Sequence, residues 1–197
     1  MEMSHVSGYT DLQIIAEALA PAGITLADIR ARFPRLIANF TEELYRFCRS
    51  HEYIMDVMPG VPQILAATND DPRFYNALLT GNFLPAARLK LELGGVDRYF
   101  DFSLGAFGEE SNVRNDLPAV AARTIRARFD YDFAPQQFII VGDTAHDIAC
   151  ARFFGAKAVA VATGRNNSAE KLRPHNPDYL FNDLSDTAEV LRVLKNI

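Results

Sequence analysis

An apolar run from Phe138 to Val141, followed by Gly142 and Asp143, constrains the fold of this chain more than any other feature. The run has no polar position, which is typical of a strand covered by helices on both faces. Open parallel sheets of such strands place their ligands beyond the carboxyl ends of the strands. The sequence therefore predicts a helix-covered parallel sheet with Asp143 at its ligand-binding edge.

Two carboxylates, Asp143 and Asp147, lie four positions apart at this strand end. Carboxylate oxygens suit a hard cation such as Mg²⁺, which usually keeps several waters. Asp143 has a competing interpretation as a plain turn residue, and Asp147 as an acidic residue of a helix's first turn, where the helix dipole favours it. A place in the first turn of a helix does not prevent Asp147 from binding a metal. We therefore expect Asp143 and Asp147 to hold Mg²⁺.

Composition excludes several classes of protein. The 197 residues, 49% of them hydrophobic, suffice for one sizeable core and a small second domain. A formal charge of -5 without a Lys/Arg cluster argues against nucleic-acid binding, and the apolar runs are too short to span a membrane. Cys48 and Cys150 lie far apart and no secretory leader is visible, so we expect reduced thiols and a cytoplasmic protein.

The order of the expected elements divides the chain in two. Helical patterns cover residues from Thr10 to about Ser50. Thr10 and Gln13 have the spacing of a capping box, which predicts a helix start, and Gly23 is expected to end that first helix. After a break at 58–62, strands and helices alternate, which favours a parallel sheet covered by helices. Strands are expected at 75–79, 102–106, 138–141, 157–162 and 179–181, and helices at 61–68, 85–93, 117–129, 147–154 and 187–194.

Two further loops follow expected strands. Thr80, Gly81 and Asn82 precede a helix and can donate hydrogen bonds to an anion at its N-terminus; alternatively Asn82 caps the helix and Gly81 permits a turn. Arg114 lies in a polar loop just before another helix, where its guanidinium can hold two phosphate oxygens or simply face the solvent.

Thr80, Arg114 and Asp143 each close a separate strand–helix unit, in the order hydroxyl, cation and acid. This order resembles the haloacid dehalogenase-like (HAD) hydrolase superfamily, and specifically its phosphatases with an early helical cap, such as phosphoglycolate phosphatase-like proteins. The motifs concerned are Ser7-Gly-Tyr-Thr-Asp11, Pro59-Gly-Val61, Leu79-Thr-Gly-Asn82 and Val141-Gly-Asp-Thr-Ala-His-Asp147. Arg114 stands where most members have lysine, which is also a cation.

The resemblance implies a fold and a chemistry. It implies a helical cap over 8–58 and a Rossmann-like α/β core over 59–197, with 1–7 as a remnant of the linker between them. It also implies a phosphatase that acts on a small phosphorylated metabolite by phosphoryl transfer to an aspartate. Thr80, Gly81 and Asn82 would then bind the phosphate, Arg114 would stabilise charge in the transition state, and Asp143 would hold Mg²⁺.

The chain departs from this family at its N-terminus. The family's nucleophile is the first acid of an Asp-x-Asp pair after the first core strand, yet residues 1–7 contain no aspartate. Asp130-Tyr-Asp132 has the spacing but follows a helix, which favours a turn. Without that central strand, backbone groups in the sheet stay unpaired, so a missing segment, a partner chain or a rearranged sheet must compensate. We therefore expect a truncated, inactive chain that tends to self-associate.

Three hypotheses about function remain. The first is a Mg²⁺-dependent HAD phosphatase whose nucleophile strand lies outside this chain. The second is a catalytically dead relative that binds phosphate or metal as a regulatory module. The third is an unrelated nucleotide binder, which the absence of a Gly-x-Gly-x-x-Gly loop disfavours.

Overall fold

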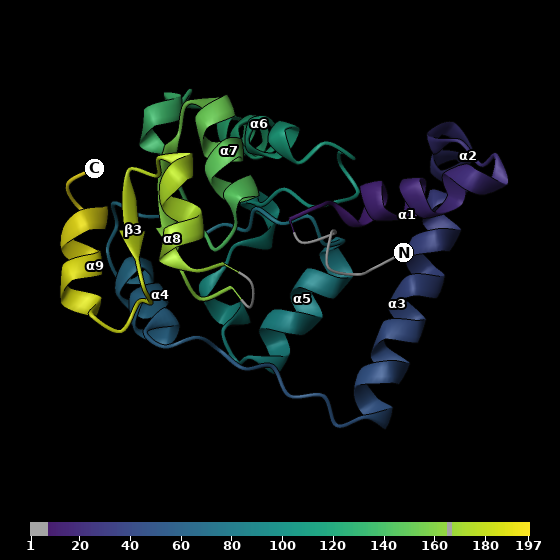
Figure 1. Cartoon of the computed structure of the whole chain (residues 1–197), viewed down its shortest axis with the longest axis horizontal. Coiled ribbons are helices and arrows are strands. Elements are labelled where there is room, and N and C mark those ends of the chain that lie inside the picture. Colours follow the sequence, from purple (N-terminus) through teal and green to yellow (C-terminus); the bar gives the residue numbers. More distant parts are fainter. Residues whose placement is uncertain (1–7, 165–166) are drawn as a thin grey trace.

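The computed structural model describes residues 8–164 and 167–197, so the expected linker remnant 1–7 lies outside the described residues. The α-helices are α1 (Asp11–Leu19), α2 (Leu26–Ala31), α3 (Phe33–Ser50), α4 (Val61–Asn69), α5 (Leu84–Leu93), α6 (Leu117–Phe129), α7 (Ala145–Phe154), α8 (Ala169–Leu172) and α9 (Thr187–Leu194). The strands are β1 (Ile139–Gly142), β2 (Lys157–Val161) and β3 (Tyr179–Phe181). Figure 1 shows α1, α2 and α3 at one end of the molecule, and α4, α7, α8 and α9 around β3 at the other.

The three strands form a parallel sheet in the order β1-β2-β3. Val159 and Val161 of β2 pack in a cluster with side chains of α4 and α9, while Ala158 and Ala160 pack with side chains of α7 and α8. All four side chains are buried, because helices cover both faces of the strand. The predicted helix-covered parallel sheet is confirmed.

Two predicted strands are wrong. In place of strands at 75–79 and 102–106, the two segments share a single parallel bridge, between Leu79 and Ala106. Residues 102–104 form a 3₁₀ turn instead, and the Asp101 carboxylate accepts a hydrogen bond from the Ser103 amide. A strand needs paired neighbours, and a local side-chain bond to the backbone competes with such pairing.

The helix boundaries follow the capping residues. Thr10 caps α1 by accepting a hydrogen bond from the Gln13 amide, as predicted, but the Gln13 side chain bonds Glu17 and does not complete a capping box. After a 3₁₀ turn, Gly23 ends this helical segment with a φ of 76°, a left-handed conformation that glycine adopts without strain.

The three N-terminal helices share one apolar cluster. Leu12 and Ile29 are buried in it, together with Phe83, which precedes α5. The Phe83 ring meets the edges of Phe33 and Phe40 at centroid distances of 5.5 and 5.4 Å. Leu36, Ile37 and Phe40 of α3 pack against this cluster, whereas Phe47 farther along the helix is 52% exposed. The division into a cap and a core stays a prediction. No helix in the described part of the chain is long and apolar enough to cross a membrane.

Candidate functional site

Arg114 and Asp147 form a buried ion pair beside the carboxyl end of β1. Arg114 Nη2 donates to Asp147 Oδ1 at 2.5 Å, and the two side chains are 14% and 9% exposed. Arg114 lies in the 3₁₀ turn Arg114–Asp116 that precedes α6, and this turn packs against α7, which carries Asp147 in its first turn. Two of the predicted site residues, 33 positions apart, are thus brought together.

Asp147 also caps α7. Its Oδ2 accepts from the Thr144 amide at 3.0 Å and from the Thr144 hydroxyl at 2.7 Å, while Thr144 Oγ1 accepts from the Asp147 amide. This capping box confirms the first-turn role and starts α7 at Ala145, two residues earlier than predicted. Because both carboxylate oxygens already have partners, a cation at Asp147 would have to compete with Arg114, and this metal role stays a prediction.

Asp143 is a half-buried carboxylate that accepts no hydrogen bond from another residue in the described part of the chain. Burial raises the pKa of Asp143, and the charge of Asp147 raises it further, against the opposing effect of Arg114. A hard cation would relieve both costs by neutralising the carboxylate. Within residues 8–164 and 167–197, no group of three or more acids, histidines or cysteines could hold a metal. Mg²⁺ can be held by one or two carboxylates, with water and phosphate oxygens completing its shell, so Asp143 would supply the open protein ligand, and its metal role stays a prediction.

One buried donor in the site has no partner. Arg114 Nε is inaccessible to solvent and makes no hydrogen bond, although Nη2 of the same guanidinium is bonded. Leaving such a donor unpaired costs about 1–3 kcal/mol. A phosphate or carboxylate oxygen could accept from it, but such a ligand would reach this nitrogen only if the surrounding groups moved, because the atom is inaccessible to solvent.

The Thr80 loop is bonded mainly to itself and to its neighbours. Thr80 Oγ1 accepts from the Asn82 amide at 3.1 Å. The Asn82 side chain donates to Asp11 and accepts from Lys90, so it does not cap α5, whose N-cap is Phe83. Among the described residues, no hydrogen bond or ion pair joins Thr80 to Arg114 or Asp143. Phosphate binding by Thr80, Gly81 and Asn82 stays a prediction.

Sequence reasoning missed two carboxylates at the start of α5. Asp11 Oδ2 accepts from the Phe83 amide at 2.8 Å, and Glu109 Oε2 accepts from the Leu84 amide at 3.0 Å. Burial raises the pKa of both acids. These contacts join residues 72 and 25 positions apart, so no local pattern marks them. They occupy two of the helix amides that we expected an anion to use.

Residues 8–11 run between the Thr80 loop and the Asp143 loop. The Asp11 amide donates to Gly81 O at 2.7 Å. A Cβ atom on Gly81 would lie 2.2 Å from Tyr9 O, and one on Gly8 would lie 2.5 Å from the His146 ring. His146 itself is exposed. The same stretch of backbone therefore lies against Gly81 of the Thr80 loop and against His146 in the first turn of α7.

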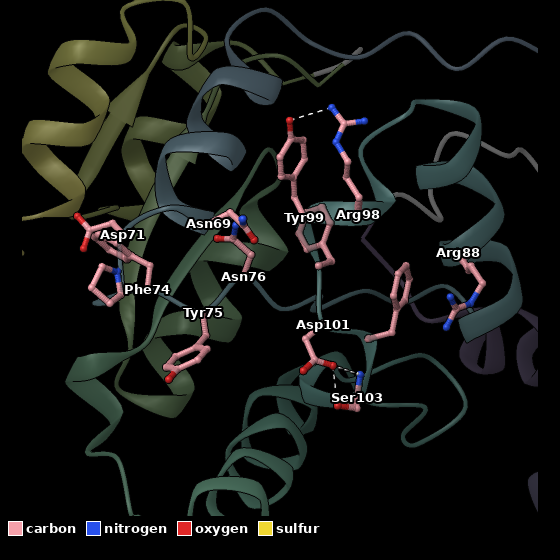
Figure 2. Close-up of a pocket in the computed structure, with 13 residues that line it drawn as sticks. Asn69, Asp71, Phe74, Tyr75, Asn76, Arg88, Arg98, Tyr99, Asp101 and Ser103 are labelled. Atoms are coloured by element: carbon pink, nitrogen blue, oxygen red, sulfur yellow. Dashed lines mark hydrogen bonds between the residues drawn. The ribbon is translucent and has the colours of Figure 1, made fainter.

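A separate cavity of about 750 Å³ lies away from these residues. It is lined by residues from 69–76 and 98–103 together with Arg88, and by none of the predicted site residues. Figure 2 shows hydrogen bonds between two pairs of its lining residues, with Arg98 donating to Tyr99 and Asp101 accepting from Ser103. Asn69, Tyr75 and Arg88 are drawn without a hydrogen bond to another lining residue.

Replacing Glu109 by glutamine is expected to change the pH dependence of unfolding. Because burial raises the pKa of Glu109 in the folded state, the folded protein binds the proton more tightly than the unfolded chain does. The stability that Glu109 contributes is then present at low pH and is lost as pH rises from 4.5 through the raised pKa. Urea unfolding of wild type and variant between about pH 3 and 7 should show their difference in unfolding free energy falling with pH.

Asp183→Asn is the matched control for Glu109→Gln. Hydrogen bonds from Ser185 lower the pKa of Asp183 below its ordinary value of 3.8. The difference in unfolding free energy between wild type and Asp183→Asn should therefore rise with pH, over pH values below 3.8. A difference for Glu109→Gln that stays flat over the whole range would show that burial does not shift this acid.

Comparisons with known proteins find similarity to the family that the motifs resemble. Residues 118–187 match the HAD-hydrolase-like family model. The chain is 24% identical to the pyrophosphatase PpaX of Halalkalibacterium halodurans over 166 residues, which cover 82% of this chain and 74% of that protein.

Solved structures share the fold. A predicted phosphoglycolate phosphatase from Haemophilus somnus matches with a TM-score of 0.55 and 21% identity over 69% of this chain and 57% of that one. A putative β-phosphoglucomutase from Thermotoga maritima matches with a TM-score of 0.60 and 16% identity over 98% and 93% of the two chains. This chain thus spans less than two thirds of the Haemophilus structure. The resemblance predicted from the motifs, and its fold, are confirmed.

Proposed function

We propose that this chain, which resembles the HAD-like hydrolases in fold and motifs, binds Mg²⁺ and the phosphate group of a small phosphorylated metabolite and derives from a phosphatase of phosphoric monoesters. The observation that carries the proposal is the group of Arg114, Asp143 and Asp147 beside the end of β1, where one buried guanidinium nitrogen lacks a partner. Relatives that are called phosphatases and a pyrophosphatase support the same chemical class.

Each residue of this group has a distinct role in the proposal. Asp143, which has no other protein partner in the described residues, would hold the cation. Arg114 would donate from its guanidinium to a phosphate oxygen, while Asp147 fixes the orientation of the guanidinium through Nη2. The Thr80 hydroxyl and the Gly81 amide would orient another phosphate oxygen. Mg²⁺, when bound, supplies neutralisation of the phosphate charge.

The proposal includes no attacking carboxylate from this polypeptide. The sequence has no Asp-x-Asp after an apolar strand, and Asp11 and Glu109 already accept backbone hydrogen bonds. We therefore expect ligand binding without turnover, in a cytoplasmic setting consistent with the free Cys48 and Cys150. A regulatory module that binds phosphate is the second candidate, favoured by the same missing nucleophile.

Calorimetry with MgCl₂ and with inorganic phosphate tests the binding. Wild type should bind Mg²⁺, and phosphate more tightly in its presence. Asp143→Asn should lose Mg²⁺ binding, because the amide carries no charge for a hard cation. Arg114→Met should weaken phosphate binding and leave Mg²⁺ binding in place. Asp183→Asn, which changes an acid after β3 that already bonds Ser185, should behave as wild type.

Two outcomes would contradict this proposal. Equal Mg²⁺ binding by wild type and Asp143→Asn would remove the metal role. Hydrolysis of p-nitrophenyl phosphate by the wild-type chain, abolished in Asp143→Asn, would show that the missing Asp-x-Asp pair does not matter. An upstream in-frame coding stretch with an apolar strand and Asp-x-Asp would favour the phosphatase over the regulatory module.

A further inference from the structure

The cavity of about 750 Å³ between 69–76, 98–103 and α5 has the size of a small-molecule site. Such sites occupy roughly 300–1,000 Å³ and are lined mainly by apolar and aromatic side chains. The aromatic side chains that line this cavity are Phe74, Tyr75, Tyr99, Phe100 and Phe102. Aromatic rings pack well against other flat rings, so the cavity suits a flat organic molecule.

Arg88 on α5 presents free hydrogen-bond donors at this cavity. Its guanidinium carbon lies 4.1 Å from the centroid of the Phe102 ring, so the ring supports one face of the guanidinium. In the part of the chain that the structure describes, no hydrogen bond or ion pair joins Arg88 to another residue. Stacking on a ring leaves the N–H groups at the edge of the guanidinium unoccupied, and this planar edge matches the two oxygens of a carboxylate. Arg88 is therefore oriented by Phe102 with its donors available.

The acidic groups of the cavity already have partners. Asp71 pairs with Arg73 at 2.6 Å and with Lys195 at 3.6 Å, and hydrogen bonds from Arg73 hold the pKa of Asp71 below its ordinary range. Asp101 accepts from the amide of Ser103 at 2.9 Å and from its hydroxyl at 2.6 Å. Asp71 is thus neutralised by two cations outside the lining, whereas Asp101 keeps its charge and has neutral donors beside it.

The remaining charges of the lining leave an excess of one positive charge. The guanidiniums of Arg88 and Arg98 accompany the carboxylate of Asp101. Arg98 is partly occupied, because it donates to Gly95 O and to the Tyr99 hydroxyl, each at 2.9 Å. A ligand with one carboxylate balances the excess charge, whereas a phosphate dianion carries one negative charge more than the lining matches.

Asn69 offers a polar group away from Arg88. Figure 2 shows Asn69 and Arg88 on opposite sides of the cavity. No hydrogen bond joins the Asn69 side chain to another residue within 8–164 and 167–197. Its amide can both donate to and accept from a hydroxyl group. A ligand that reaches from Arg88 to Asn69 therefore carries a carboxylate at one end and a hydroxyl group at the other.

We propose that this cavity binds a small aromatic monocarboxylate, with the carboxylate on Arg88, the ring among the aromatic side chains and a hydroxyl group on Asn69. The cavity includes none of Arg114, Asp143 and Asp147, so the proposal does not rest on Mg²⁺ or phosphate binding. The failure of either proposal leaves the other standing.

Calorimetry on the full chain with a hydroxynaphthoate tests this inference. The probe carries its carboxylate and its hydroxyl group on different rings. Wild type should bind it with a Kd below about 1 mM. The methyl ester of the same compound lacks the negative charge, and cyclohexanecarboxylate lacks the aromatic ring. Each of these two compounds should bind at least about tenfold more weakly than the probe.

Variants of Arg88 locate the binding site. Arg88→Met should weaken binding of the probe at least about tenfold, and Arg88→Lys should weaken it less, because an ammonium keeps the charge but not the planar fork. Arg88 is exposed, so both variants should unfold at temperatures close to that of wild type. Arg123→Met is the matched control. It changes another exposed helical arginine that has no hydrogen bond or ion pair among the described residues, and it should bind as wild type does.

Four outcomes would overturn the inference. The first is absence of binding by wild type at about 1 mM probe. The second is equal binding of the acid and its ester. The third is an equal loss of binding in Arg88→Met and Arg123→Met. The fourth is a loss of binding in Asp143→Asn, which would place the ligand beside β1 instead of in this cavity.

Discussion

Asp147→Asn is expected to lower the free energy of unfolding by about 3–5 kcal/mol, because it leaves the Arg114 guanidinium buried without its counter-ion. The Asp147 side chain is 9% exposed, and its two oxygens accept from Arg114 and from Thr144. Such a loss is a large part of an ordinary protein's stability. Urea unfolding at pH 7 measures it, with the slope m checked for a change in two-state behaviour.

The matched control is an ion pair of similar length on the surface. Arg192 and Glu189 approach to 2.6 Å but are 63% and 43% exposed, so Glu189→Gln should change stability little. The double variant Arg114→Met, Asp147→Asn should recover part of the loss, since neither charge is then buried alone. If Asp147→Asn costs no more than Glu189→Gln, the buried pair does not stabilise the site.

Gly108→Ala is expected to destabilise the protein by about 3 kcal/mol and to separate two loops of the candidate site. A Cβ atom on Gly108 would lie 1.9 Å from Gly81 O and 2.8 Å from Gly81 C, which are backbone atoms that cannot turn aside. The Gly108 amide also donates to Asn82 O. Thermal unfolding measures the loss, and faster amide exchange at Leu84 would report release of the Glu109 contact.

Gly94→Ala tests whether the effect comes from the backbone contact. The nearest atom to a Cβ on Gly94 is a methyl of Val57 at 3.0 Å, and this side chain can move. Both variants add one methyl group at a residue outside the helices, so a difference between them isolates the contact with Gly81. Equal melting temperatures would mean that the two loops are not held together through Gly108.

Local patterns predicted the elements that depend on local forces. The run before Gly142 predicted β1 to within one residue, and α6 and α9 have the predicted bounds. The first-turn position of Asp147 was an expected alternative, whereas its capping box with Thr144 was not predicted, although the two residues have capping spacing. The predicted strand at 75–79 was wrong because an apolar run indicates burial but does not say whether a neighbour is present to pair with it.

Part of the candidate site could likewise be predicted from the sequence, and part could not. Asp143 and Asp147 could be named from their position after an expected strand that does form, since parallel strands bring their carboxyl ends to one edge of a sheet. Arg114 was named from its place after an expected strand at 102–106 that does not form. The pairing of Arg114 with Asp147, the unpartnered Nε and the carboxylates of Asp11 and Glu109 on the α5 amides could not be inferred. These contacts depend on how separate loops are placed relative to one another, and local propensity does not predict that placement.

The sequence by itself determined the helix-covered parallel sheet, most helix ends and the polar residues at the strand ends, because periodicity and capping act over a few residues. Only the tertiary structure decided which of those polar groups already have partners among the described residues. The reason is that hydrogen-bond donors and acceptors are satisfied by whatever lies nearest in space, and residues 8–11, 80–84 and 109 become neighbours only when the chain is folded.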